Sequence, residues 1–500
     1  MDELDAGVKR LSFRLEEFKN SLQPIQQLPP DVIVEIATFL NPKACGGDCQ
    51  PLMDMSQVCR LWRETLISNP ESWSFVSSEY MGLFPLFLER SGSYPLEVQL
   101  NTDTPFSYAV GYIRSHANRL VTLRCHLEEA NIGFLHTLSQ LDHLPNLRTL
   151  SIRIARAPTV FPQVIEMAFV SDDMPSLRTL ELLPFPVIPQ FVQFKHLTNL
   201  QLNVTYSTLT NVLDLLAANP SLEKVRLLGN FEDSEDARAM GSILLGRLQF
   251  FTVERCTPCT FLEKLAFPRN ARIFIRYNLI SHFIPFAFTL PQSMREYANL
   301  QGLTSLHVLM AYQNDTYIDV TGPHGSVAVQ FMDLRDASPV CNVIASLSTT
   351  GITQLVCEFH PALTRMEMEK VARLMDILPD LEEVVLVHFG GTDTQEFIST
   401  LRNTSMWVKL LRLKFVHCRQ TTNWIGNLIH VAAERMDEGL VLDTVTVVDE
   451  GKEQVQELFG VLEGFVGTFE FVEVEPGEVT RSEQVWDDAS WTTRVIPVPV

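Results

Sequence analysis

The sequence predicts an α/β protein in which a small all-α segment of three short helices precedes a curved, repetitive array with a parallel sheet. Apolar residues crowd at helical spacing into residues 28–73, and the pattern L-x-x-L-x-L recurs after residue 80. Stretches with helical periodicity separate the recurrences. A chain of 500 residues with 46% hydrophobic and 20% charged residues can bury a core of this size.

Residues 1–27 are predicted to form an N-terminal amphipathic helix. Its apolar residues follow one another at spacings of three and four, and these are Val8, Leu11, Leu15, Phe18 and Leu22. Such spacing places them on one helical face. This face either folds onto the next segment or pairs weakly with another chain.

Residues 28–80 are predicted to form the three short helices. Pro30 fits the first turn of a helix that ends at "NP". The loop "KACGGDCQP" follows, a second apolar stripe runs from Leu52 to Trp62, and "SNPESW" ends the segment with a turn. Because a unit of about fifty residues is too small to bury all its apolar side chains, part of this stripe is expected to remain exposed for a partner.

The same segment resembles an F-box. "LPPDVIVEI" with "FL" after it, "LMDMSQVCRLWRE" and "NPESW" follow the order and spacing of that motif, although the insert "KACGGDCQ" is longer than the usual connection. In the family, the F-box docks onto a Skp-type adaptor, which bridges to a cullin scaffold carrying the ubiquitin-transfer machinery. The resemblance implies that the F-box fold and its adaptor surface are formed by Leu28, Pro29, Ile33, Ile36, Leu40, Leu52, Val58, Cys59 and Trp62. Alternatively, these residues are only the core of a small helical cap.

A degenerate leucine-rich-repeat-like solenoid is predicted over residues 81–480. The L-x-x-L-x-L pattern appears at 144–154, 174–184, 194–204, 219–229 and 378–388. Its first positions in the early copies are 20 to 30 residues apart, at Leu120, Leu147, Leu177, Leu197, Leu222 and Leu248. Leucine-rich repeats have a period of about 20–29 residues. Later copies start at Ile352, Leu381 and Leu410, whereas the pattern is blurred over 260–350.

Each repeat is expected to contribute one strand to a parallel sheet and one covering helix, as in "LTNVLDLLAAN" and "MEKVARLMDIL". Asn230, Cys256 and Cys418 occupy the N/C position of the repeat, where a small polar side chain satisfies buried backbone groups. The predicted core residues are Leu147, Leu150, Leu177, Leu180, Leu222, Val225, Leu381 and Leu386. Residues 481–500 are expected to form a C-terminal tail.

The outward positions of the predicted strands hold more bases than acids. The bases are Arg124, Lys224, Arg226, Arg412 and Lys414, against Glu181 and Glu383. One hypothesis is that this strip binds an acidic or phosphorylated segment of a target protein. The alternative is that the charges are ordinary solvated side chains, some of which meet the acidic C-terminal segment of the same chain.

Composition excludes several classes of function. The formal charge of -21 repels nucleic acid and anionic membranes, and no apolar run reaches the ~18 residues of a membrane span. Residues 434–488 hold sixteen acids and three bases, a net charge of -13. The segment "MDELDAGVKRLSFRLEEFKN" is too charged for a signal peptide, and nine scattered cysteines fit reduced thiols. We therefore expect an intracellular protein, cytoplasmic or nuclear.

No catalytic or metal site is predicted. "CTPC" at 256–259 and "CGGDC" at 45–49 lack a second pair of zinc ligands. "VTGPHGSV" at 320–327, with His324 and Ser326, lacks the phosphate-loop spacing and reads as a turn. Glu382 and Glu383 are adjacent on a strand and are expected to face opposite sides. No cofactor is expected.

The resemblance to an F-box, together with the repeats, implies a non-catalytic substrate-recognition subunit of a Skp-cullin-F-box ubiquitin ligase. It would bind the adaptor through the F-box and an unidentified target protein through the repeats. One alternative is an interaction scaffold that has lost adaptor docking. A second alternative is an enzyme whose site lies within 260–350.

Overall fold

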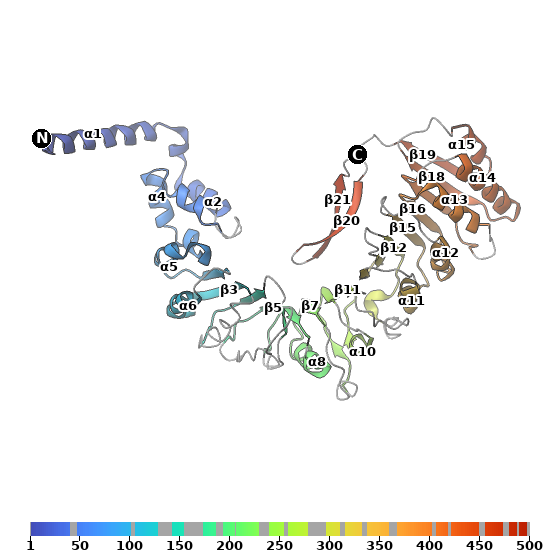
Figure 1. The fold of residues 1–500 in the computed structure, drawn as a ribbon, viewed down its shortest axis with the longest axis horizontal. Coiled ribbons are helices and arrows are strands. Elements are labelled where there is room, and N and C mark those ends of the chain that lie inside the picture. The colour runs from blue at the N-terminus through green and yellow to red at the C-terminus, as the bar shows by residue number, and fades with distance from the viewer. Residues whose placement is uncertain are drawn as a thin grey trace. The chain divides into compact units, whose positions relative to one another are not determined.

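A computed structural model describes residues 2–40, 48–101, 106–128, 143–154, 174–186, 194–205, 207–229, 240–254, 259–278, 297–310, 316–332, 338–359, 368–402, 407–418, 422–449, 456–473, 480–487 and 490–497. The fold is mixed α/β, with a large, mostly parallel sheet and several helices (Figure 1). It divides into two compact units, Met1–Ser207 and Thr208–Val500.

The first unit begins with helices. They are α1 (Asp2–Ser21), η1 (Pro24–Gln27), α2 (Pro30–Phe39), α3 (Gln50–Met55), α4 (Arg60–Ile67) and η2 (Pro70–Trp73). Pro30 stands at the first turn of α2, as predicted, where its missing N–H costs no helical hydrogen bond. Further along the chain come η3 (Ser78–Leu83), α5 (Phe84–Arg90), α6 (Phe106–Ser115) and η4 (Ala117–Arg119).

The strands of the first unit pair in chain order, and every pair is parallel. They are β1 (Phe75–Ser77), β2 (Leu96–Leu100), β3 (Leu120–Leu127), β4 (Thr149–Ile154), β5 (Thr179–Pro186) and β6 (Asn199–Asn203). Since β1 lies within residues 28–80, the helical segment runs directly into the sheet and does not end before it.

The second unit contains two stretches of parallel strands. The first consists of α8 (Leu209–Ala218), β7 (Lys224–Leu228), β9 (Phe250–Glu254) and β11 (Arg272–Asn278), with the short elements β8 (Ile243–Leu244), α10 (Cys259–Leu262) and β10 (Leu265–Ala266) beside them. The second consists of β15 (Gln354–Phe359), β16 (Glu383–Val387), β17 (Arg412–Val416), β18 (Leu442–Asp449) and β19 (Val466–Glu473).

Helices alternate with the strands of the second stretch, and Figure 1 shows them along one side of it. They are α11 (Ser338–Ser346), α12 (Met368–Asp376), α13 (Gly391–Thr400), α14 (Thr422–Asp437) and α15 (Gln456–Leu462). α8 and α12 occupy the two stretches for which the sequence predicted amphipathic helices.

The blurred middle of the sequence contains a departure from parallel pairing. β12 (Ser305–Met310), β13 (Thr316–Thr321) and β14 (Ser326–Met332) form an antiparallel meander, preceded by η9 (Ala298–Leu300). β14 pairs parallel with β11 and β12 pairs parallel with β15, so the meander joins the two stretches. The expected alternation of one strand and one helix is therefore wrong here, because a hairpin replaces a covering helix.

The core matches the sequence prediction. All eight predicted core positions are buried, among them Leu150, Leu180 and Leu386. Cys418 follows β17 and is 2% exposed, with its sulfur 3.5 Å from the backbone oxygen of Leu386. This contact is the role predicted for the N/C position, whereas Asn230 and Cys256 lie outside the described residues.

The C-terminal segment is paired rather than a simple tail. β20 (Thr480–Asp487) and β21 (Ser490–Pro497) form an antiparallel hairpin.

Candidate functional site

The helices α2, α3 and α4 are held together by a small core. Ile33, Leu52 and Trp62 are 0%, 0% and 6% exposed. These three residues were predicted to form the F-box fold and its adaptor surface. In the structure they are buried in the core of the segment, in which α2 packs against α4. Their contribution is to the fold of the segment.

A second set of apolar side chains on the same helices faces outward. Val32, Phe39, Val58, Leu61 and Ile67 are 39–71% exposed, and we call them the apolar helix surface. Exposed apolar side chains that cluster in sequence over a small unit are typical of a protein interaction site.

The predicted adaptor residues are thus divided between core and surface. Pro29 and Val58 are exposed, whereas the half-buried residues are Leu28, Ile36, Leu40 and Cys59. The predicted set omitted most of the apolar helix surface. A count of side chains per helical turn could have found them, because α2 and α4 each carry apolar residues on more than one face.

Trp73 is a buried side chain that supports the helices carrying the apolar helix surface. It is fully buried, and its Nε1 donates a hydrogen bond of 2.8 Å to the backbone oxygen of Leu66. Its ring meets that of Phe87 edge-on at 5.1 Å, and the guanidinium carbon of Arg90 lies 4.3 Å from the ring centre. One side chain therefore joins α4 to α5.

The end of the long insert is also tied to this unit. The hydroxyl of Tyr80 donates a hydrogen bond of 2.5 Å to Oδ1 of Asp48. This bond raises the pKa of Tyr80 to about 12 and lowers the pKa of Asp48. The connection from α2 to α3 is thus fixed at its second end.

The five predicted basic positions lie on strands, but most of them face acids. Arg124 lies 3.5 Å from Glu97, and the Arg226 guanidinium lies 2.7 Å from the Glu254 carboxylate. Arg412 lies 3.7 Å from both Glu382 and Glu383. The expectation of a strip with excess bases is therefore wrong at these three arginines, because Glu97, Glu254, Glu382 and Glu383 balance their charge.

Glu382 and Glu383 need a further correction. They were expected to face opposite sides, yet both carboxylates approach Arg412. β16 begins only at Glu383, so the alternation of a strand does not apply to the residue before it.

Lys224 and Lys414 are half-buried. Lys224 lies in β7 with its ammonium 5.5 Å from the ring centre of Phe250, and the Arg272 guanidinium carbon lies 5.8 Å from the same ring. Among the residues that the structure describes, no acid forms an ion pair with either Lys224 or Arg272. Lys224 and Arg272 thus place two basic groups beside the Phe250 ring.

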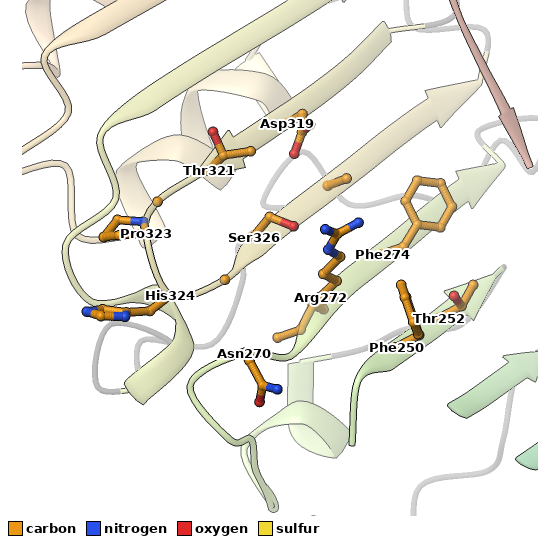
Figure 2. Close-up of a pocket in the computed structure, with 14 residues that line it drawn as sticks. Phe250, Thr252, Asn270, Arg272, Phe274, Asp319, Thr321, Pro323, His324 and Ser326 are labelled. Atoms are coloured by element: carbon orange, nitrogen blue, oxygen red, sulfur yellow. The ribbon is translucent and has the colours of Figure 1, made fainter. Parts of the chain in front are cut away.

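A cavity of about 470 Å³ lies beside Phe250, on β9, β11, β13 and β14 (Figure 2). Aromatic walls from Phe250 and Phe274 stand next to the Arg272 guanidinium and the Asp319 carboxyl. The remaining lining groups include amides and hydroxyls, from Asn270, Thr252, Thr321 and Ser326. This mixture of an aromatic ring, a cation and hydrogen-bonding groups can bind a polar peptide segment.

The turn predicted at 320–327 forms one end of this cavity and is confirmed. The N–H of Gly322 donates to the oxygen of Gly325 at 3.0 Å, between β13 and β14. Both positions need glycine, since a side chain on Gly325 would meet the backbone oxygens of Ala271 and Asn299 at 2.8 Å. The turn is thereby pressed against the rest of the unit.

The cavity does not contain a nucleophile and base in contact. Figure 2 shows the imidazole of His324 directed away from the hydroxyl of Ser326. In the part of the chain that the structure describes, no three His, Cys, Asp or Glu residues group to hold a metal ion. Burial raises the pKa of the Cys49 and Cys357 thiols to about 12, so both stay protonated at neutral pH.

Asp319 makes the stability of the second unit dependent on pH. Its burial raises the pKa, against the opposing influence of His307 and Arg272. Because a carboxyl with a raised pKa binds its proton more tightly in the folded chain, stability falls as pH rises from about 4, the usual value, through the folded value. We expect Asp319→Asn to raise the melting temperature at pH 7 and to lose this advantage below about pH 4. Equal melting temperatures at pH 7 would contradict this, and Glu396→Gln, an exposed carboxyl, is the control.

No helix among the described residues is both long and apolar enough to cross a lipid bilayer. No protein-family model matches the chain, and no curated protein matches it either.

Proposed function

We propose that this protein is a non-catalytic substrate receptor of a Skp-cullin-F-box ubiquitin ligase. The single observation that carries the proposal is the apolar helix surface, which lies on α2, on α4 and just before α4, within the segment that resembles an F-box. The adaptor would cover this surface, and the strand-rich remainder of the chain would bind a target protein.

The division between core and surface supports docking without a change of fold. Ile33, Leu52 and Trp73 are buried within the chain itself, so the helices have a core before any partner arrives. The outward residues can then bury area against the adaptor. Each fully buried aliphatic side chain contributes about 1.5–3 kcal/mol before the costs of association.

The strand-rich part supports target binding through polar contacts. Its sheet carries paired charges such as Arg226 and the buried Glu254, and charges that are arranged in this way can give specificity to an interface. The cavity beside Phe250 provides a concave site with an aromatic wall. Aromatic and arginine side chains are those most often found at the centre of protein interfaces.

The mechanism of such a receptor is proximity. A lysine of the bound target is held near the ubiquitin-charged conjugating enzyme that the cullin carries, and its effective concentration rises. None of the residues described above has to act as acid, base or nucleophile in this mechanism.

Capture of the adaptor tests the proposal. The intact chain should retain the Skp-type adaptor and cullin in a pull-down, and the double variant Phe39→Asp/Val58→Asp should lose both, because each change places a charge at an exposed apolar position. Val408→Asp, at a side chain that is 55% exposed in the second unit, is the matched control and should bind like the intact chain. Trp62→Ala is unsuitable, since Trp62 belongs to the core.

The rival function is an interaction scaffold without ligase docking. If the chain is such a scaffold, neither the intact chain nor any variant should retain the adaptor in the pull-down, although the strand-rich part should still bind a partner. Adaptor binding that survives the double variant would instead show that docking uses another surface.

A further inference from the structure

Helix α1, dark blue in Figure 1, exposes a continuous apolar stripe. Val8, Leu11, Leu15 and Phe18 are 58–69% exposed. The apolar face that the sequence predicted is therefore present, and its side chains are mostly exposed. Water in contact with four large apolar side chains on one helix favours their burial against a partner.

The spacing of this stripe is that of a coiled coil. Intervals of three, four and three residues place Val8 and Leu15 at a positions of a heptad and Leu11 and Phe18 at d positions. A stripe confined to a and d positions is narrow and fits one other helix better than the broad face of a globular core.

The charges that flank the stripe decide which helix fits. Asp5, Ser12 and Lys19 occupy e positions, and Arg14 occupies a g position. All four are exposed, and the carboxylate of Asp5 lies 3.4 Å from the ammonium of Lys9 in an exposed ion pair on the same helix. Residues at e and g lie beside the partner helix and determine its orientation.

A second copy of α1 fits in the antiparallel orientation. With Val8 opposite Phe18 and Leu11 opposite Leu15 of the other copy, each e position faces an e position. Asp5 of each copy then faces Lys19 of the other, which gives two pairs of opposite charge. The one unfavourable contact is between the two copies of Arg14, at the centre.

The parallel orientation is less favourable. There each g position faces the e position of the next heptad in the partner. Arg14 of each copy therefore faces Lys19 of the other copy, which gives two contacts between like charges. The parallel pair has two repulsions and no attraction, whereas the antiparallel pair has two attractions and one repulsion.

We propose that α1 is a self-association element, which pairs antiparallel with α1 of a second copy of this chain. The helix is about 30 Å long, at 1.5 Å per residue, so the pairing is weak and depends on concentration. This inference does not depend on the proposed ligase function, because it uses only the charges and the exposed stripe of α1.

Reversing single charges in the full-length chain tests the proposal. Asp5→Lys places lysine opposite Lys19, and Lys19→Asp places aspartate opposite Asp5. In either variant alone both attractive pairs of the dimer become repulsive, so self-association should weaken roughly tenfold. Sedimentation of each protein over a range of concentrations measures this. Circular dichroism checks that the helix remains.

A mixture of the two variants is the decisive part of this experiment. In the mixture both flanking pairs become attractive again, so a tagged Asp5→Lys chain should capture an untagged Lys19→Asp chain at least as well as the intact chain captures itself. Leu11→Asp should abolish capture, and Phe13→Asp, at an exposed position outside the stripe, should leave it unchanged.

Three results would overturn the proposal. Stronger self-association of Lys19→Asp alone would show the parallel orientation, since Arg14 would then face an acid. Failure of the mixed variants to capture one another would show that these charges do not face each other. A monomeric intact chain at all concentrations would show that the stripe does not bind a second copy.

Discussion

Replacing Trp73 by alanine is expected to lower the free energy of unfolding of the first unit by about 3 to 5 kcal/mol. The side chain is fully buried, and its removal leaves a cavity between α4 and α5. It also removes the hydrogen bond from Nε1 to the backbone oxygen of Leu66, which keeps the hydrogen bond from the Asn69 N–H. It also removes the ring contact with Phe87. Chemical denaturation with hydrogen exchange of residues 60–90 as the readout measures the loss.

Trp73→Phe is the matched variant. It keeps an aromatic ring near Phe87 but cannot donate to the Leu66 oxygen, so its loss should be clearly smaller than that of alanine. Equal stability of Trp73→Ala and the intact chain would show that Trp73 does not join α4 to α5. Adaptor binding should fail in Trp73→Ala through unfolding, whereas it should fail in the surface variants with the fold intact.

Gly325→Ala is expected to destabilise the second unit by about 3 kcal/mol. The added methyl group would lie 2.8–2.9 Å from three backbone oxygens, those of Ala271, Asn299 and Arg269, and backbone cannot move aside as a flexible side chain can. The turn would have to withdraw from the loop before β11. Thermal unfolding of the full chain, with hydrogen exchange of residues 316–332, measures the effect.

Gly246→Ala is the control for this substitution. No atom lies within 4 Å of the position where its methyl group would stand, so its effect should stay within about 0.5 kcal/mol. Similar stabilities for the two variants would contradict the close approach at Gly325.

The repeat pattern predicted much of the fold because burial and periodicity are local properties. Leu147, Leu177 and Leu381 stand at the start of their repeats and are buried, and strands β4, β5 and β16 follow them. In each case the strand begins two residues after the leucine. A stretch of twelve residues carries this information on its own.

The meander of β12, β13 and β14 was not predictable in the same way. The turn at Gly322–Gly325 has a local signature, but the pairing of β14 with β11 joins Arg272 to Ser326 across more than fifty residues. Nothing in the composition of either strand specifies that partner. The break in the repeat pattern indicated only that something else occupies residues 260–350.

The same limit applies to the charges and to the helices. Arg226 and Glu254 lie on separate strands, so their ion pair depends on the register of β7 against β9. On the helices, the motif identified Ile33 and Val58 together, although one is buried and the other is 50% exposed. Which apolar side chain packs inward depends on how α2 meets α4, and this requires the three-dimensional structure.

Hydrogen exchange of the full chain, with and without the purified Skp-type adaptor, tests the central claim most directly. The account predicts that added adaptor slows exchange in residues 30–40 and 55–67, which carry the apolar helix surface, and that Phe39→Asp/Val58→Asp removes this protection. Exchange in β15–β19 should not change. Unaltered exchange over residues 30–67 at saturating adaptor, or protection confined to the second unit, would contradict the assignment of this surface to ligase docking.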